Sequence, residues 1–137
     1  MQDMSDISGG ASAPRDLSLA EMVETFDVTP RTVRYYEYME LIASRLDGRV
    51  RYYDARAQAR FKLALRGRRF GMRLEDVRLW LEIYDSHGKA AQLERWVEME
   101  AGLRDQLRAE IAERQAALDE LEGLRRAVDE ELQALEA

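Results

Sequence analysis

The chain has 137 residues, no cysteine, one histidine and a formal net charge of −6. This length suits one domain with an appended helix, and the missing cysteine excludes disulfides, thiolate metal sites and cysteine nucleophiles. No apolar run reaches membrane-spanning length, and no secretory signal pattern is present at the start. We therefore expect a soluble, cytoplasmic protein that contacts no membrane and holds no metal or cofactor.

The charge is divided unevenly along the chain. Residues 31–73 contain twelve Lys/Arg and four Asp/Glu, a net charge of +8, whereas residues 81–137 contain seven and fifteen, a net charge of −8. A division of this kind is typical of a basic binding half followed by an acidic assembly half. Two ordinary solvated surfaces are the alternative interpretation.

Two short helices are predicted after a polar N-terminal tail. Residues 1–15 lack apolar periodicity and are expected to be disordered. Ser18 and Glu21 form the pattern of a capping box, which predicts the start of a first helix with one apolar face. Thr29 and Pro30 then predict the start of a second, because Thr is a good N-cap and Pro suits the first helical position.

The second helix carries a cationic and aromatic outer face. Its members follow helical spacing and are Arg31, Arg34, Tyr35 and Tyr38. Arg side chains can bridge guanine or phosphate oxygens, and Tyr can donate to phosphate. Two short helices joined by a tight turn form a helix-turn-helix, whose second helix enters the DNA major groove. A solvated charged face is the alternative.

A hairpin is predicted next, at Asp47-Gly48. These residues lie between short extended runs and favour a type I′ turn, which needs positive φ at both central positions. A hairpin after a helix-turn-helix is a wing. Arg45, Arg49 and Arg51 on this wing are candidates for phosphate contacts, and a purely structural hairpin is the alternative.

Further helices complete the pattern. Asp54 predicts the cap of a helix over about residues 55–69, and a short fourth helix carries Trp80 as a core anchor. Residues 85–88 then break the periodicity. We expect a winged helix-turn-helix DNA-binding domain over residues 16–85 and a dimerisation helix over residues 86–137.

The last helix has an apolar stripe that one helix cannot bury. Residues 89–137 contain no proline, and their apolar residues recur at steps of mostly three, four or seven, so a partner helix is needed. Arg114 and Arg125 interrupt the stripe. The predicted dimerisation residues are Leu103, Leu107, Ile111, Leu118, Leu121, Leu124, Val128 and Leu132.

The order of these elements, with Arg34-Tyr35-Tyr36-Glu37 and a wing ending Arg51-Tyr52-Tyr53, resembles the MerR family of bacterial transcriptional regulators. The stretch 61–71 is similar to the branch that controls branched-chain amino-acid and acyl-CoA breakdown. The resemblance implies a mainly α fold and a homodimer joined by an antiparallel coiled coil. It also implies binding to double-stranded promoter DNA, which the dimer distorts between the −35 and −10 elements so that RNA polymerase engages both.

The same resemblance assigns roles to residues. Arg31, Thr32, Arg34 and Tyr35 would contact the groove and its phosphates, while Tyr36, Arg49, Arg51 and Tyr53 match positions that hold the backbone or brace the wing. Two positions depart from the pattern. Glu40 stands where the family usually has glycine, and Arg73 stands where Ser or Thr usually caps a helix.

Two classes of function remain open. The first is a dimeric DNA-binding transcriptional regulator. The sequence does not show whether it responds to an effector, and names none. The second is an interaction protein that uses the same helices to bind another protein, and salt-sensitive binding to duplex DNA would separate the two. No nucleophile, base and orienting group cluster together, so we predict no catalytic residue and no enzyme activity.

Overall fold

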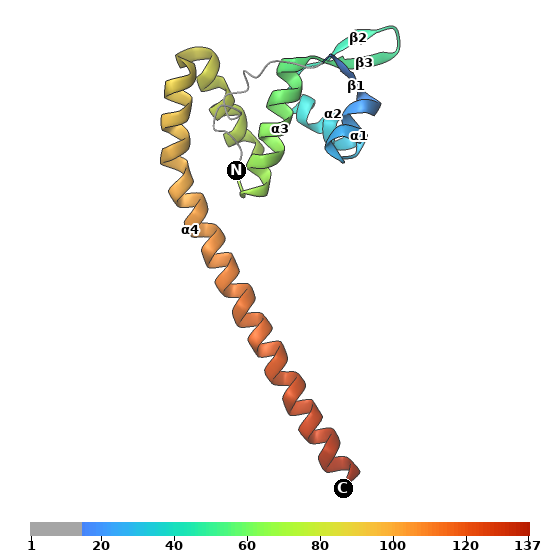
Figure 1. Ribbon diagram of the computed structural model, residues 1–137, viewed down its shortest axis with the longest axis vertical. Coiled ribbons are helices and arrows are strands. Elements are labelled where there is room, and N and C mark those ends of the chain that lie inside the picture. Colours follow the sequence, from blue (N-terminus) through green and yellow to red (C-terminus); the bar gives the residue numbers. More distant parts are fainter. Residues whose placement is uncertain (1–14) are drawn as a thin grey trace. The chain divides into compact units, whose positions relative to one another are not determined.

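The computed structural model describes residues 15–137, and the expected disordered tail lies, except for Arg15, outside the described residues. In chain order the elements are β1 (Leu17–Ser18), α1 (Leu19–Phe26), α2 (Pro30–Tyr38), β2 (Arg45–Asp47), β3 (Val50–Tyr53), α3 (Ala55–Arg69) and α4 (Leu74–Glu136) (Figure 1). This mainly helical chain with a small wing and a long C-terminal helix confirms the predicted fold class. The described residues form two compact units, residues 15–101 and residues 102–137.

The predicted helix starts are confirmed by side-chain caps. The Ser18 hydroxyl accepts a hydrogen bond from the Glu21 N–H at 3.1 Å, and the Glu21 carboxylate accepts one from the Ser18 N–H at 3.0 Å. The Thr29 hydroxyl accepts from the Thr32 N–H at 3.1 Å, and Asp54 caps α3 in the same way. These caps satisfy N–H groups that the first turn of a helix leaves unpaired.

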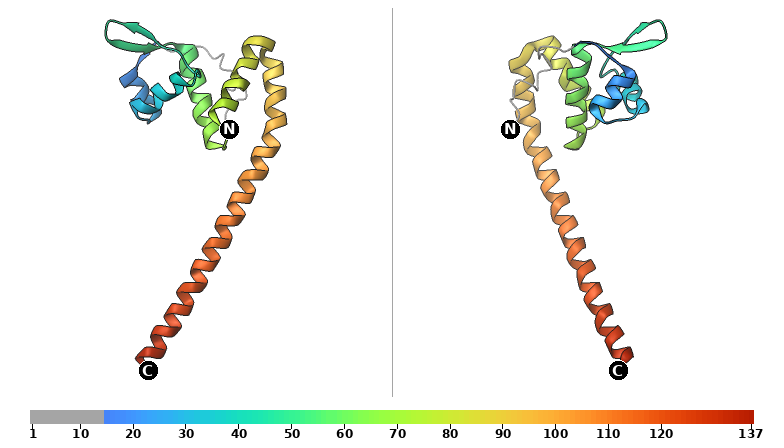
Figure 2. Two further views of the ribbon diagram at one scale, coloured as in Figure 1. Left: turned by 180° about the vertical axis from the view of Figure 1, so that it is seen from behind. Right: turned by 45° about the vertical axis from the view of Figure 1, so that its right-hand side comes forward.

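The wing is an antiparallel hairpin of β2 and β3 that projects from the helices of its unit (Figures 1 and 2). Asp47 pairs with Val50, so the two-residue loop is Gly48-Arg49 and the predicted loop Asp47-Gly48 was wrong by one residue. Gly48 has φ 64°, whereas Arg49 does not have positive φ. Positive φ at the first central residue alone is the pattern of a type II′ turn, which places glycine where it is needed.

Sequence analysis missed the third strand of the sheet. In β1, Leu17 pairs with Tyr53 and Ser18 with Tyr52, which gives the strand order β1-β3-β2. A strand of two residues is too short to show alternation, so only its pairing partner reveals it. The pairing places β3 in the middle of the sheet and ties the start of the first unit to the root of the wing.

The two helices of the helix-turn-helix share one buried ring. Phe61 on α3 is fully buried, and its ring centroid lies 5.0 Å from that of Phe26 and 5.1 Å from that of Tyr36. Val33 and Met22 are also fully buried. The inner faces of α1 and α2 are therefore fixed against α3, which leaves the outer face of α2 to solvent.

Helix α4 is interrupted at Gly88, where φ is 88° and ψ is 179°. Within the first unit, the early part of α4 runs up to a bend and the chain then folds back beside it (Figure 1). The Trp80 indole N–H donates to the carbonyl oxygen of Gln92 at 2.9 Å, and this bond holds the two arms of the reversal together. Trp80 is buried, which confirms its predicted role as a core anchor. The expected functional division between residues 85 and 86 stays a prediction.

Gln92 and Gln58 are the two buried glutamines of the described chain, and their side-chain amides differ in hydrogen bonding. Gln92 is 0 % exposed, and neither its amide nitrogen nor its amide oxygen has a hydrogen-bond partner within residues 15–137. The Gln58 amide instead donates to the carbonyl oxygens of Arg15 at 2.9 Å and Tyr53 at 3.0 Å. A buried polar group without a partner costs about 1–3 kcal/mol of stability.

We predict that Gln92→Leu raises the free energy of unfolding by about 1–3 kcal/mol, because it removes unpartnered polar atoms at similar volume. Gln58→Leu is the matched control and is expected to lower the free energy of unfolding, since it leaves two carbonyl oxygens without their donor. Urea denaturation of both variants measures the difference. A loss of stability in Gln92→Leu would show that the amide has a partner in solution.

The C-terminus of α2 explains the unusual Glu40. The Leu41 N–H donates to the Tyr36 carbonyl at 3.0 Å and the Glu40 N–H to the Glu37 carbonyl at 3.0 Å, which together form a Schellman motif. The motif needs a left-handed residue, and Glu40 has φ 63°. Helix α3 ends in the same way at Gly71, where φ is 94°. A side chain in this conformation costs roughly 1–2 kcal/mol, which glycine avoids.

We predict that Glu40→Gly raises the free energy of unfolding by about 0.5–1 kcal/mol, because relief of the left-handed strain exceeds the added flexibility of the unfolded chain. Glu40→Ala keeps the Cβ atom and is expected to give no such gain. Thermal denaturation of both variants compares them. Equal stability of the two variants would mean that the conformation at residue 40 carries no strain.

Candidate nucleic-acid interface

The outer face of α2 is cationic and aromatic, as its spacing predicts. Arg31 and Arg34 are exposed, and Tyr35 and Tyr38 are 50 % and 80 % exposed. The two tyrosine rings stack with centroids 6.5 Å apart. The face therefore presents guanidinium groups, hydroxyl donors and two flat rings to solvent. Thr32 is half-buried, and its hydroxyl lies 3.0 Å from that of Thr29 at the helix start.

Ion pairing separates the arginines of this region into two groups. Arg31, Arg34 and Arg49 form no ion pair with any carboxylate among residues 15–137. Arg45 pairs with Asp16 at 3.0 Å and lies over the ring of Tyr52, 4.9 Å from its centroid. An arginine without an acidic partner is free to bind an anion from outside the chain. A paired arginine must first break its ion pair.

Two of the predicted DNA-binding residues are core side chains. Tyr53 is 0 % exposed, and Tyr36 is buried against Phe61. The Tyr53 hydroxyl donates to the Glu37 carboxylate at 2.8 Å. Burial and this hydrogen bond raise the pKa of Tyr53 to about 12, so the hydroxyl remains a donor at neutral pH. Both rings pack beneath the surface and support it, and neither presents a face to solvent.

Glu37 is a residue of this surface that sequence analysis did not single out. Its carboxylate also accepts hydrogen bonds from the Arg51 guanidinium at 3.2 Å and from the Ser44 hydroxyl at 2.9 Å. Arg51 was expected at phosphates, and here it faces an acid of α2. The available signal was the acid itself, which follows directly after the Arg-Tyr-Tyr run and stands out in a basic stretch.

A groove of about 620 Å³ extends the positive surface beyond α2. It is lined by Arg31 and Tyr35 from α2, by Arg68 and Arg73 from the corner between α3 and α4, and by one acid, Glu75, among other residues. The Arg73 side chain cannot cap α4, because a guanidinium has no hydrogen-bond acceptor, and it pairs with Asp76 at 3.2 Å. Sequence analysis did not place this corner beside the outer face, since only packing brings them together.

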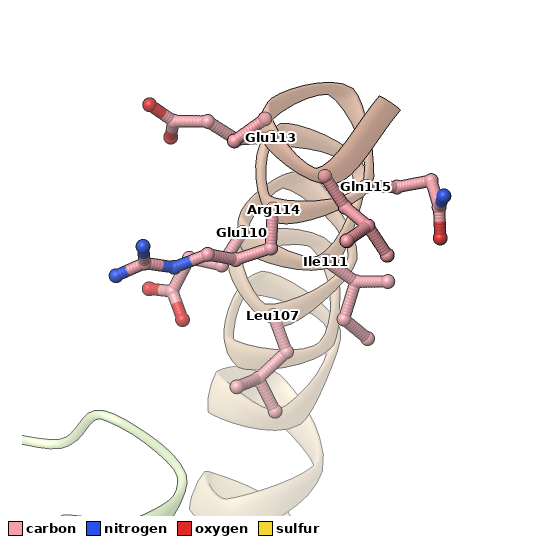
Figure 3. Close-up of a pocket in the computed structure, with 8 residues that line it drawn as sticks. Leu107, Glu110, Ile111, Glu113, Arg114 and Gln115 are labelled. Atoms are coloured by element: carbon pink, nitrogen blue, oxygen red, sulfur yellow. The ribbon is translucent and has the colours of Figure 1, made fainter. Parts of the chain in front are cut away.

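The apolar stripe of the second unit is exposed to solvent. Ile111 and the predicted stripe residues that follow it are exposed, while Leu103 and Leu107 are half-buried. Leu107 and Ile111 project from the same side of the helix, beside a shallow hollow that this one helix lines (Figure 3). Nothing in the described part of this chain covers the exposed residues of the stripe.

The arrangement defines a class: a winged helix-turn-helix protein with a long helix that bears an exposed apolar stripe. Residues 17–82 match the profile described as "MerR HTH family regulatory protein", and residues 58–124 match the profile described as "MerR, DNA binding". The chain belongs to the MerR family, which confirms the resemblance seen in the sequence. The branch within the family stays a prediction.

A solved structure supports the fold. HiNmlR, described as a MerR family regulator lacking the sensor domain and bound to promoter DNA, superposes with a TM-score of 0.61 at 20% identity. The match covers 76% of this chain and 79% of that one. No curated protein matches this sequence significantly. Among the described residues, no helix is long and apolar enough to span a bilayer, and no group of acidic or His side chains could hold a metal ion.

Proposed function

We propose that this protein is a dimeric, sequence-specific DNA-binding transcriptional regulator. The observation that carries the proposal is the outer face of α2, where Arg31 and Arg34 have no acidic partner within residues 15–137 and stand beside exposed Tyr35. An α-helix fits the major groove, where Arg reads guanine and base edges give sequence information. Arg49 on the wing is also without an acidic partner in that part of the chain, which supports a contact with the flanking phosphates. We call α2 the recognition helix below.

The proposed dimer rests on the apolar stripe of the second unit. Burying each of its large aliphatic side chains is worth about 1.5–3 kcal/mol, and a second copy supplies a matching stripe. A two-fold dimer of MerR-family chains, joined by an antiparallel coiled coil, then presents two recognition helices to two half-sites. A palindromic site follows from that symmetry.

The proposed mechanism is a distortion of promoter DNA between the −35 and −10 elements. Bending a site of 20–30 base pairs costs on the order of 1–6 kcal/mol, and contacts from two heads can offset that cost. RNA polymerase would respond to the altered spacing and twist of the DNA. Its involvement is therefore indirect, and this chain needs no polymerase-binding surface for it.

We predict different losses for Arg34→Ala and Arg49→Ala. Arg34→Ala is expected to weaken binding to the preferred sequence by about 1–3 kcal/mol and to reduce discrimination, because the helix reads bases. Arg49→Ala is expected to weaken binding to all sequences alike. It is also expected to reduce the slope of log K against log salt by about 0.9, because one phosphate contact is lost. Titrations use duplexes that the wild-type protein selects from a random pool, with a scrambled duplex for comparison.

Arg126→Ala is the control, since it removes the same charge from the second unit. Unchanged affinity in both test variants would contradict the assignment of the DNA-binding residues. A wild-type protein that selects no duplex at low salt would contradict the proposed function itself and favour a protein-interaction role.

We predict that Leu107→Asp combined with Leu118→Asp yields monomers that retain the folded first unit and lose DNA affinity. Two buried charges are incompatible with an apolar seam, and one head alone makes few contacts. Light scattering and a DNA titration on the same sample measure both effects. The control is Ala109→Asp with Ala116→Asp, which adds the same charges at exposed positions off the stripe. A test variant that stays dimeric would exclude the stripe as the interface.

A further inference from the structure

One carboxylate joins the recognition helix to the wing. Glu37 of α2 has a side chain only 20% exposed. Its Oε1 accepts from the Tyr53 hydroxyl at 2.8 Å, and its Oε2 accepts from Arg51 Nη1 at 3.2 Å and from Ser44 Oγ at 2.9 Å. Arg51 Nη1 also donates to Ser44 Oγ at 3.0 Å. The group is therefore a closed network around a single acid.

The partners of Glu37 come from the segment that must be held in place. Arg51 and Tyr53 lie on β3, the central strand of the sheet, and Ser44 lies in the loop that leads from α2 to β2. Bonds to β3 fix the whole hairpin, because both other strands pair with it. Hydrogen bonds to a charged acceptor are about twice as strong as neutral ones, so this acid is well suited to set the position of the wing.

The electrostatics of the network make it costly for Arg51 to leave Glu37 and bind a DNA phosphate. A carboxylate on the DNA-facing side of the protein repels phosphate unless a cation balances it. Arg51 supplies that cation, and moving its guanidinium to a phosphate would leave Glu37 partly buried and unbalanced. Breaking a partly buried ion pair by removing one partner is costly, because the other charge remains without compensation.

We propose that Arg51 acts through Glu37 and does not contact DNA, and that Glu37 is the positioning residue that sets the distance between the recognition helix and the wing. This inference rests on the proposed DNA binding. It predicts that wing contacts and helix contacts are made together only when the network is intact. Glu37 thereby contributes to sequence specificity without touching a base.

The test is a double-variant cycle on the full-length protein. Arg51→Met keeps the length of the stem but leaves the Glu37 charge unbalanced, and we expect at least a tenfold loss of affinity for the selected duplex. Adding Glu37→Gln restores the wild-type net charge and keeps an oxygen acceptor for Tyr53. We expect the double variant to recover affinity to within about threefold of wild type, with the wild-type salt slope. If Arg51 binds a phosphate, the double variant stays as weak as the single one and the slope falls by about 0.9, which would overturn the inference.

Glu37→Asp separates geometry from charge. It keeps the carboxylate but shortens the side chain by one methylene, so the bond to Tyr53 is lost. We expect the ratio of specific to non-specific affinity to fall at least fivefold, and an unchanged ratio would overturn the positioning role. The control cycle uses Arg45→Met with Asp16→Asn, an ion pair at the wing root that does not involve α2. An equal fall of the ratio in this control would assign the effect to general loosening of the wing.

The failures of the two proposals are distinguishable. A wild-type protein that binds no duplex overturns the proposed function, and this inference with it. A wild-type protein that binds DNA, while the cycle shows no rescue, overturns only the role of Glu37. Urea denaturation of each variant ensures that every titration is made on folded protein.

Discussion

The contact on which the binding surface depends is the packing of Phe61 between Phe26 and Tyr36. Helix α2 has nine residues, and helices of that length are marginal alone in water. Its structure must therefore come from packing against α1 and α3. Because the inner face supplies that stability, the outer face is free to carry arginines and tyrosines that contribute nothing to the core.

Charge availability matters more for this surface than net charge. The chain is acidic overall, yet its basic stretch has a net charge of +8. Within that stretch, ion pairs engage Arg45 and Arg51, while Arg31, Arg34 and Arg49 have no acidic partner among the described residues. A phosphate competes with an internal carboxylate only at the paired positions. Among the arginines of α2 and the wing, pairing thus leaves the available charge on the recognition helix and the tip of the wing.

Features with local causes were predictable from the sequence, and features with distant causes were not. The caps Ser18, Thr29 and Asp54 act within three residues, and the structure has all of them. The turn of the wing was misplaced by one residue because cross-strand pairing decides the register. The strand β1 was missed because its partner lies more than thirty residues away along the chain.

The candidate site shows the same limit. Helical spacing correctly placed Arg31, Arg34 and Tyr35 on the solvent side of α2. The same sequence gave no indication that Tyr53 is buried, or that its hydroxyl reaches Glu37 across sixteen positions. Glu40 is an intermediate case. The resemblance to the MerR family marked this position as unusual. Only the backbone of the structure showed that the residue there has a left-handed conformation.

The two arginines that interrupt the apolar stripe bear on how two copies would pair. Arg125 forms an ion pair with Asp129 one turn away on its own helix, with Nε 3.0 Å from the carboxylate. Its charge is thus balanced locally, and its aliphatic stem can lie along apolar neighbours. A polar residue at a seam position lowers the stability of a coiled coil but fixes its register, because shifted pairings place the charge against apolar side chains. In the proposed dimer, Arg114 and Arg125 would therefore give up some stability in exchange for one defined alignment of the helices. A defined alignment is what two DNA-binding heads need, because the spacing of half-sites on a duplex is fixed by the helical repeat.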